Sequence, residues 1–191
     1  MGEKTFIIGI TGAFGSGKST AADFLKPLGF TKISLAQFLE EELKNRGEKK
    51  ITRKLLQDLG NKWREKYGPV ILAQKALAEI KDKGLKKVVV EGFRNVSEIS
   101  AFREMGDFKL IGIVVNRDIR FSRLKNLQRR EKLSWDLFNK LDDRDLGIGE
   151  GKNGLQVAFC LALSDIFIEN NGSLKEIKKK IQDIVREEKI I

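Results

Sequence analysis

The sequence predicts an α/β fold of three layers (α/β/α), in which helices cover both faces of a five-stranded parallel sheet. Two observations predict it. Short apolar runs of strand character alternate with longer amphipathic segments, which is the pattern of successive βαβ units. The first apolar run is apolar on both faces, as a central parallel strand is, and it leads through a glycine-rich turn into a helix. Crossovers between such strands are expected to be right-handed.

Five segments have the length and composition of buried strands. Each is rich in apolar or β-branched residues and is bounded by residues that favour turns or helix starts. They are residues 4–10, 30–33, 86–92, 108–115 and 166–168.

Helical spacing and end signals predict the connecting helices. Ser34 can cap a helix that ends at Gly47, and Pro69 is well placed to begin another. The expected helices cover residues 20–26, 35–45, 51–67, 70–80, 95–105, a segment beginning near 118, residues 155–163, and a last helix capped by Ser173. The helical block at about 34–83 is longer than a simple crossover requires, so we interpret it as an inserted acceptor-binding unit.

A basic segment follows the fourth predicted strand. Seven Lys and Arg residues lie within residues 117–132, and an acidic cluster at 142–145 and four glycines at 147–154 come after them. Because core residues are few there, we expect a mobile lid at about 117–150. Residues 1–33, 84–116 and 155–191 would form the core of a single domain.

A glycine-rich motif lies between the first strand and the first helix. It fits G-x-x-x-x-G-K-[ST] and reads Gly12-Ala13-Phe14-Gly15-Ser16-Gly17-Lys18-Ser19, followed by Thr20. Glycines let the backbone turn tightly and approach a ligand, and the inward N–H groups then form a socket for phosphate oxygens. Lys18 would reach the outer phosphates of a nucleotide, and the Ser19 hydroxyl would bind Mg²⁺. The competing interpretation is an ordinary glycine-rich turn.

A carboxylate at the end of the third strand is the second candidate for the metal. Three valines run into Glu91, as in a Walker B element, and ligands of open α/β sheets bind at the carboxyl ends of strands. The alternative is an ordinary carboxylate at a strand end.

Composition excludes several classes of function. The 191 residues contain no histidine, which excludes imidazole acid–base chemistry and histidine metal ligands, but leaves phosphoryl transfer possible. Cys160 is the single cysteine and lies in an apolar run, so we expect a buried thiol. The chain shows no membrane-spanning run and no signal-peptide layout, and we expect a cytoplasmic protein without a membrane partner. The net charge of +10 allows nucleic acid as a partner without favouring it.

Taken together, these segments resemble the nucleoside monophosphate kinase branch of the P-loop NTPases. The closest likeness is to an archaeal-type group of uncharacterised P-loop proteins related to adenylate kinase and dephospho-CoA kinase, and it spans nearly the whole chain. The stretch Ile8–Ser19 is close to the opening of dephospho-CoA kinases, and Glu91-Gly92-Phe93-Arg94 resembles the Asp-Gly-Phe-Pro-Arg of adenylate kinases. The corner at 33–36 resembles the part that lines the acceptor base.

The resemblance implies roles for particular residues. Arg94 would hold the phosphate of the acceptor. Lid arginines would contact the transferring phosphoryl group, with Arg144 the first candidate beside Arg129 and Arg130. The turn at 170–173, and Asn171 within it, would wrap the donor adenine. ATP and Mg²⁺ are the cofactors that the family implies.

Two departures from the family concern the acceptor. Adenylate kinases carry an arginine where this chain has Glu40, so an acceptor phosphate would need another partner, such as Arg46, Arg53 or Lys54. Dephospho-CoA kinases carry aspartates just after the second strand, whereas residues 34–37 here include no carboxylate. A hydroxyl acceptor needs a base and a phosphate acceptor needs cations, so we favour a phosphate acceptor.

We therefore expect an enzyme that moves the γ-phosphate of Mg·ATP to a nucleoside monophosphate or a similar small phosphorylated molecule. One alternative is a dephospho-CoA kinase-like enzyme that phosphorylates a sugar hydroxyl. An alternative of another class is a regulatory or nucleic-acid-associated P-loop ATPase. The identity of the acceptor and the oligomeric state are not encoded in any pattern that we can interpret.

Overall fold

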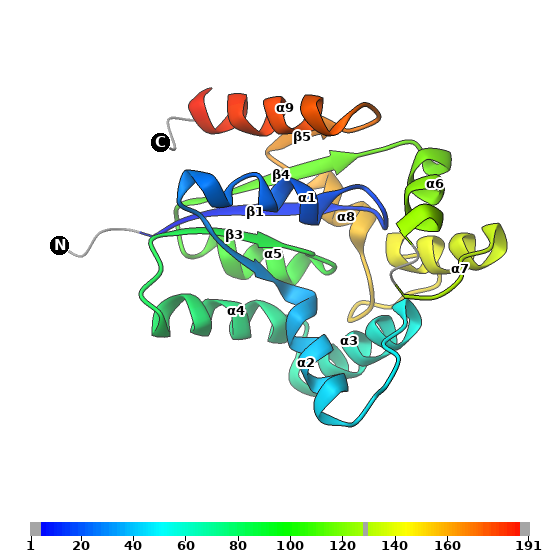
Figure 1. Cartoon of the computed structure of the whole chain (residues 1–191). Coiled ribbons are helices and arrows are strands. Elements are labelled where there is room, and N and C mark those ends of the chain that lie inside the picture. Colours follow the sequence, from blue (N-terminus) through cyan, green and yellow to red (C-terminus); the bar gives the residue numbers. More distant parts are fainter. Residues whose placement is uncertain (1–4, 128–129, 188–191) are drawn as a thin grey trace.

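A computed structural model of the chain describes residues 5–127 and 130–187. Its centre is a five-stranded sheet in the order β2-β3-β1-β4-β5, and every neighbouring pair is parallel. The strands are β1 (Phe6–Gly12), β2 (Thr31–Ser34), β3 (Lys87–Glu91), β4 (Phe108–Val114) and β5 (Ile166–Glu169). The α/β fold with a parallel sheet of five strands is therefore confirmed (Figure 1).

Helices cover both faces of this sheet. On one face α1 (Lys18–Asp23) and α9 (Leu174–Glu187) enclose a core that includes Ile8, Ile10 and Ile111 of the strands. On the other face the core includes Val88, Val90 and Leu110, and it is covered by α2 (Leu35–Asn45), α3 (Arg53–Tyr67), α4 (Ile71–Asp82), α5 (Val96–Arg103) and α8 (Val157–Ala162). Alternation of side chains along each strand divides the two cores between the faces.

The remaining helical elements lie in the connections. A 3₁₀ turn, η1 (Lys26–Leu28), follows α1, and α6 (Arg117–Leu127) and α7 (Trp135–Leu146) follow β4. Figure 1 shows α6 and α7 next to each other beyond one end of the sheet, with α3 near α7. The expected acceptor-binding unit corresponds to α2, α3 and α4, which connect β2 to β3.

The largest difference from expectation is α7. We expected a segment with few core residues there, whereas Phe138 and Leu141 are buried with Leu133 in a third hydrophobic cluster. The Ser134 hydroxyl caps the helix by accepting from the Leu137 amide at 3.1 Å. The helix packs on the glycine-rich loop, where the rings of Phe14 and Phe138 stack with their centroids 6.2 Å apart.

Two expectations from composition concern the whole chain. Cys160 is buried in the larger core, and burial raises the pKa of its thiol. Within residues 5–127 and 130–187, no helix has both the length and the apolar character needed to cross a membrane.

Candidate functional site

The glycine-rich loop connects β1 to α1 and has the backbone that its glycines permit. Gly15 and Gly17 have φ angles of 82° and 89°, in the left-handed region that favours glycine. A Cβ at Gly17 would lie 2.7 Å from Asn170 Nδ2, and one at Gly15 would lie 2.8 Å from Leu124 Cδ1. A larger residue at either position would strain the backbone and clash with these side chains.

Two side chains hold the loop from outside. Arg120 of α6 donates to the Phe14 carbonyl at 2.9 Å, and Asn170, just after β5, donates to the Ser16 carbonyl at 3.0 Å. Both side chains are buried. The loop is thus fixed by segments that lie about 100 and 150 residues further along the chain.

The inside of the loop has the character of an anion site. Lys18 Nζ donates to the carbonyls of Gly12 and Ala13, at 2.7 Å and 3.0 Å. Burial, and then the charge of Arg94, lowers the pKa of Lys18 to about 7. The Ser16 hydroxyl is buried and has no hydrogen-bond partner. A phosphate oxygen would accept from Ser16 and restore the charge of Lys18, so the loop residues fit a nucleotide phosphate.

The candidate magnesium ligands also fit. Ser19 and Thr20 lie in the first turn of α1, and Glu91 is buried at the end of β3, in register with Ile10 and Ser34. Glu91 is close enough to Lys18 to favour its charged form. Among the described residues no cluster of three or more acidic or Cys ligands could hold a metal. Mg²⁺ in nucleotide sites takes one or two protein oxygens and completes its shell with phosphates and water.

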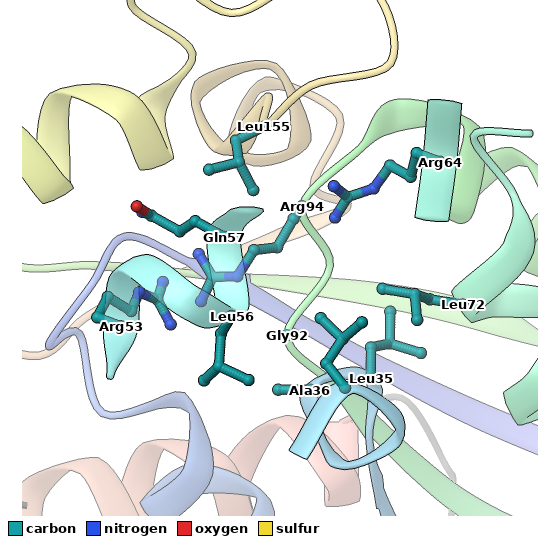
Figure 2. Close-up of a pocket in the computed structure, with 11 residues that line it drawn as sticks. Leu35, Ala36, Arg53, Leu56, Gln57, Arg64, Leu72, Gly92, Arg94 and Leu155 are labelled. Atoms are coloured by element: carbon teal, nitrogen blue, oxygen red, sulfur yellow. The ribbon is translucent and has the colours of Figure 1, made fainter. Parts of the chain in front are cut away.

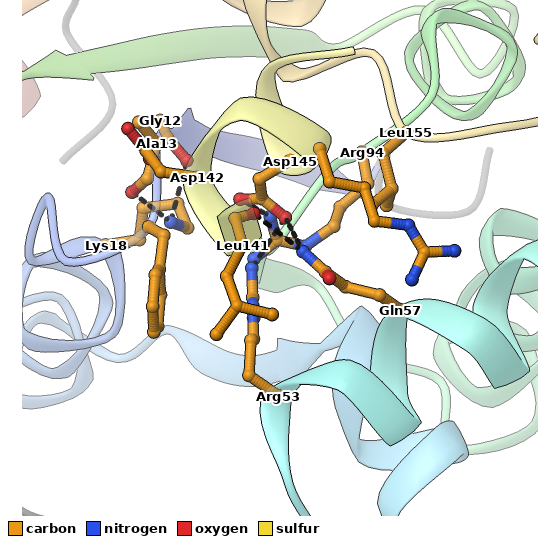
Figure 3. Close-up of polar contacts among 12 residues, drawn as sticks. Gly12, Ala13, Lys18, Arg53, Gln57, Arg94, Leu141, Asp142, Asp145 and Leu155 are labelled. Atoms are coloured by element: carbon orange, nitrogen blue, oxygen red, sulfur yellow. Dashed lines mark hydrogen bonds and ion pairs between the residues drawn. The ribbon is translucent and has the colours of Figure 1, made fainter. Parts of the chain in front are cut away.

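A group of cations meets at Asp145 of α7. Arg53 of α3 donates to Asp145 Oδ1 at 2.7 Å, and Arg94 forms an ion pair with Asp145 Oδ2. Gln57 donates to Asp145 Oδ1 at 3.3 Å and to the Leu141 carbonyl at 3.0 Å. Figure 3 shows this group beside Lys18 and the loop. Two distant segments, α3 and the turn after β3, therefore converge on one carboxylate of α7.

The carboxylate of Asp145 is fully buried yet charged. Burial alone raises the pKa of Asp145, but the charges of Arg53, Arg94 and Lys18 outweigh that effect and lower the pKa to about 2. Burial and the neighbouring charge of Arg94 lower the pKa of Arg53 to about 10. The cations thus outnumber Asp145, and an added anion would be stabilised between them.

A small pocket adjoins this group. Its apolar wall comes from side chains of α2, α3 and α4, among them Leu35, Leu56 and Leu72, while Arg53, Arg64 and Arg94 supply the polar side (Figure 2). Its free volume is about 20 Å³, room for about one water molecule, so a small-molecule ligand would have to widen it. Arg53 and Arg94 line the pocket, and both are close enough to Lys18 of the glycine-rich loop for their charges to lower its pKa.

Hydrogen bonds made by the backbone of Arg94 fix its position. Glu98 accepts from the amides of Arg94 and Asn95 at 2.8 Å and 3.2 Å, and the Arg94 carbonyl accepts from Gln156 at 2.6 Å. Glu98 in turn accepts from Arg64 Nε at 3.1 Å, and both side chains are almost fully buried. Asn95 caps α5, so hydrogen bonds hold the turn after β3 on both sides of Arg94.

The lid arginines are arranged differently from one another. Arg144 forms ion pairs with Asp58 of α3 and with Glu150 in the loop after α7. Its side chain therefore lies against α3 and that loop and not against the glycine-rich loop. Arg130 pairs with Glu40 of α2. Arg129 lies outside the described residues.

Asn170 and Asn171, in the turn after β5, make different contacts. Asn171 accepts from the Asn116 amide at 2.8 Å and donates to Glu169 at 2.6 Å. Its neighbour Asn170 makes the contact with the glycine-rich loop. Contact of Asn171 with an adenine stays a prediction.

Comparison with known proteins places the chain in a family. No model of a protein family matches it. It is 31% identical over 183 residues to the UPF0200 protein of Methanothermobacter thermautotrophicus, covering 94% of this chain and 89% of that protein. The chain belongs to the UPF0200 family. It is also 32% identical over 186 residues to the UPF0200 protein of Pyrococcus abyssi, covering 94% and 95% of the two chains.

Solved structures of P-loop kinases share the fold of this UPF0200 chain. Shikimate kinase from Acinetobacter baumannii has a TM-score of 0.60 at 15% identity, covering 99% of this chain and 97% of that one. Dephospho-CoA kinase from Campylobacter jejuni has a TM-score of 0.50 at 22% identity, covering 96% and 97%. The relation to P-loop kinases is therefore confirmed for the fold, and the nucleoside monophosphate kinase family in particular stays a prediction.

Sequence reasoning assigned no role to Asp145 or Gln57, and it included Asn170 only as part of the turn at 170–173. One signal was available for Asp145. Phe138, Leu141 and Asp145 share a helical spacing, so a charged residue occupies the buried stripe of α7. A carboxylate in such a stripe requires buried cationic partners.

Proposed function

We propose that this protein is an ATP-dependent phosphotransferase that moves the γ-phosphate of Mg·ATP to a small phosphorylated acceptor, a nucleoside monophosphate being the first candidate. The observation that carries the proposal is the group of Lys18, Arg53 and Arg94 between the glycine-rich loop and the adjoining pocket. Phosphoryl transfer depends mainly on positioning and on cations around the transferring group.

Each part of the site has a role in this proposal. The loop residues 12–20 and Lys18 bind the β- and γ-phosphates, while Ser19 holds Mg²⁺, with Glu91 acting through water. Arg94 and Arg53 hold the acceptor phosphate in the pocket. Arg144 and Arg129 stay candidates for the transferring group; Arg144 would first have to leave Asp58 and Glu150. Asn171 would border the adenine.

The charges support a phosphate acceptor over a hydroxyl acceptor. A hydroxyl must lose its proton to a base, and Asp145 is the buried carboxylate nearest to the acceptor arginines. Its low pKa of about 2 makes it a weak base. The surplus of cations around it matches the needs of a phosphate that is already an anion.

Two other activities remain as alternatives. Transfer to a sugar hydroxyl, as in a dephospho-CoA kinase-like enzyme, is supported by the shared fold. A regulatory or nucleic-acid-associated ATPase is supported by the net charge of +10. An acceptor that is phosphorylated on phosphate separates the proposed function from both.

Arg94→Ala tests the acceptor role within this proposal. We expect the KM for the acceptor to rise at least tenfold and the KM for ATP to change little, because the Arg94 side chain lines the pocket. Steady-state kinetics with each substrate varied in turn give the two values. Arg103→Ala, an exposed arginine paired with Asp165 at 3.0 Å, is the matched control. Equal losses for both substrates would contradict the assignment.

A further inference from the structure

The candidate metal ligand Ser19 is already in contact with a cation. Lys32 of β2 donates to Ser19 Oγ at 2.7 Å and to the Ser19 carbonyl at 3.0 Å. Its third contact is Asp23 Oδ1, at 3.1 Å. An ammonium group has three N–H donors, so these contacts satisfy it completely. The Lys32 side chain is only 15% exposed, so it is held at this place by its surroundings.

A bound magnesium ion would lie very close to this ammonium group. Magnesium coordinates oxygen at about 2.0–2.1 Å. With Lys32 Nζ at 2.7 Å from the same oxygen, the two cations would stand about 4 Å apart. Like charges at that distance repel strongly near a protein surface. Either magnesium binding is weakened, or the ammonium turns toward Asp23, which it already contacts.

We propose that Lys32 stands in for the metal cation at Ser19. In the absence of magnesium its ammonium holds the Ser19 hydroxyl and supplies positive charge beside the phosphate socket, which supports the binding of metal-free nucleotide. Magnesium loading then requires the ammonium to give up Ser19 and keep Asp23. This role rests on the proposed binding of nucleotide, but it concerns a residue for which the phosphotransferase proposal has no use.

The proposal predicts two effects of opposite sign in Lys32→Met. The affinity for ATP in the presence of EDTA falls about tenfold, because a neighbouring cation is lost. The affinity of the ATP complex for magnesium rises about tenfold, because the repulsion is lost. The magnesium concentration that half-saturates the complex is therefore about tenfold lower. A general loss of structure would weaken both, so the opposite signs distinguish the role of Lys32 from damage to the fold.

Isothermal titration calorimetry measures both quantities without reference to turnover. ATP is titrated into the protein in EDTA, and Mg²⁺ is titrated into the protein saturated with ATP. Lys26→Met is the matched control, because Lys26 pairs with the same Asp23 oxygen at 2.7 Å but is 55% exposed. Lys32→Gln should reproduce Lys32→Met. In a Ser19→Ala background, Lys32→Met should no longer change the magnesium titration.

The outcomes separate this inference from the proposed function. Opposite shifts in Lys32→Met, with Lys26→Met unchanged, would support it. Lys32→Met values equal to the wild-type values in both titrations would overturn it while the nucleotide site stands. Wild-type protein that binds neither ATP nor Mg·ATP would remove the proposed function and this inference together.

Discussion

Asp145 is the residue on which the arrangement of the candidate site depends most. Its carboxylate is fully buried and receives hydrogen bonds or ion pairs from Arg53, Arg94 and Gln57. A buried charge is tolerated only when partners compensate for its lost hydration. Here the compensation is mutual, since the arginines need a buried anion as much as the aspartate needs cations. A substrate phosphate would supply a second such anion.

Asp145→Asn should therefore destabilise the free protein and strengthen its response to anions. We expect the free energy of unfolding to fall by about 3–5 kcal/mol, because the arginines lose their buried counter-charge. Inorganic phosphate or ATP should then raise the Tm of the variant more than that of the wild type. Thermal unfolding with and without these ligands measures both effects.

The control for this variant is Asp136→Asn, an exposed position in the same helix. The acid limb gives a second check. Because the folded pKa of Asp145 is about 2, its stabilising contribution is present above the unfolded pKa of about 3.9 and is lost as the pH falls toward 2. That part of the acid dependence should be missing in Asp145→Asn. Unchanged stability and an unchanged response to phosphate would refute the assigned balance of charges.

Lys18 gives nucleotide binding a pH dependence near neutrality. Burial and then Arg94 lower its pKa to about 7, and a bound phosphate would raise it again. Binding should therefore take up protons, and the affinity for ATP should fall as the pH rises above 7, by up to about tenfold per unit. Calorimetry in buffers with different ionisation heats measures the proton uptake. An affinity that is flat from about pH 7 to 9 would show that Lys18 is fully charged in the free protein.

Sequence predicted the local part of the site and missed the long-range part. The loop at 12–19, Lys18 and the turn with Arg94 lie in short motifs, whose residue types are dictated by the backbone and the ligand. Asp145 and Asn170 act through contacts with residues 92 and 154 positions away. No spacing in the sequence encodes such contacts, because they depend on how whole helices pack.

At the scale of the element, α7 links the two halves of the site. One face carries Phe138, whose ring stacks on Phe14 of the glycine-rich loop, and Asp145, which pairs with Arg53 of α3. Arg53 also lies 4.6 Å above the Phe14 ring. Movement of α7 would therefore change the loop and the acceptor arginines together.

The helix α7 was hidden in the sequence for a physical reason. Its buried stripe contains Asp142 and Asp145 beside Phe138 and Leu141, so charge interrupts the hydrophobic period that identifies a helix. The burial of Asp142 is compensated by Arg120 of α6, which donates to its carboxylate at 2.9 Å. Helices with purely apolar stripes, such as α2 at Leu35–Asn45, were predicted with the bounds that the structure has.

Phe138→Ala tests whether α7 is packed as firmly as its cluster indicates. The ring is fully buried among Leu133, Leu141 and the partly buried Phe14, so its loss should reduce the free energy of unfolding by about 3–5 kcal/mol. Chemical denaturation gives the value, and Lys140→Ala on the exposed face of α7 is the control. A loss below about 1 kcal/mol would mean that the helix leaves the loop readily in solution.

At the scale of the molecule, the order of the strands brings the site together. The central β1 has β3 and β4 as neighbours, so the glycine-rich loop, Glu91 and Arg94 all leave the same carboxyl edge of the sheet. Ligands of open α/β sheets bind at this edge. The alternation of strands and helices predicted the sheet, but it does not state the strand order.

Acceptor-stimulated release of ADP from Mg·ATP tests the central claim most directly. ADP release would be measured for the wild type alone, then with each nucleoside monophosphate, its deoxy form and dephospho-CoA, and repeated for Lys18→Ala. We predict strong stimulation by a phosphate-bearing acceptor, a product phosphorylated on that phosphate, and no turnover in Lys18→Ala. Slow hydrolysis that no acceptor changes, or full turnover in Lys18→Ala, would contradict the proposed function.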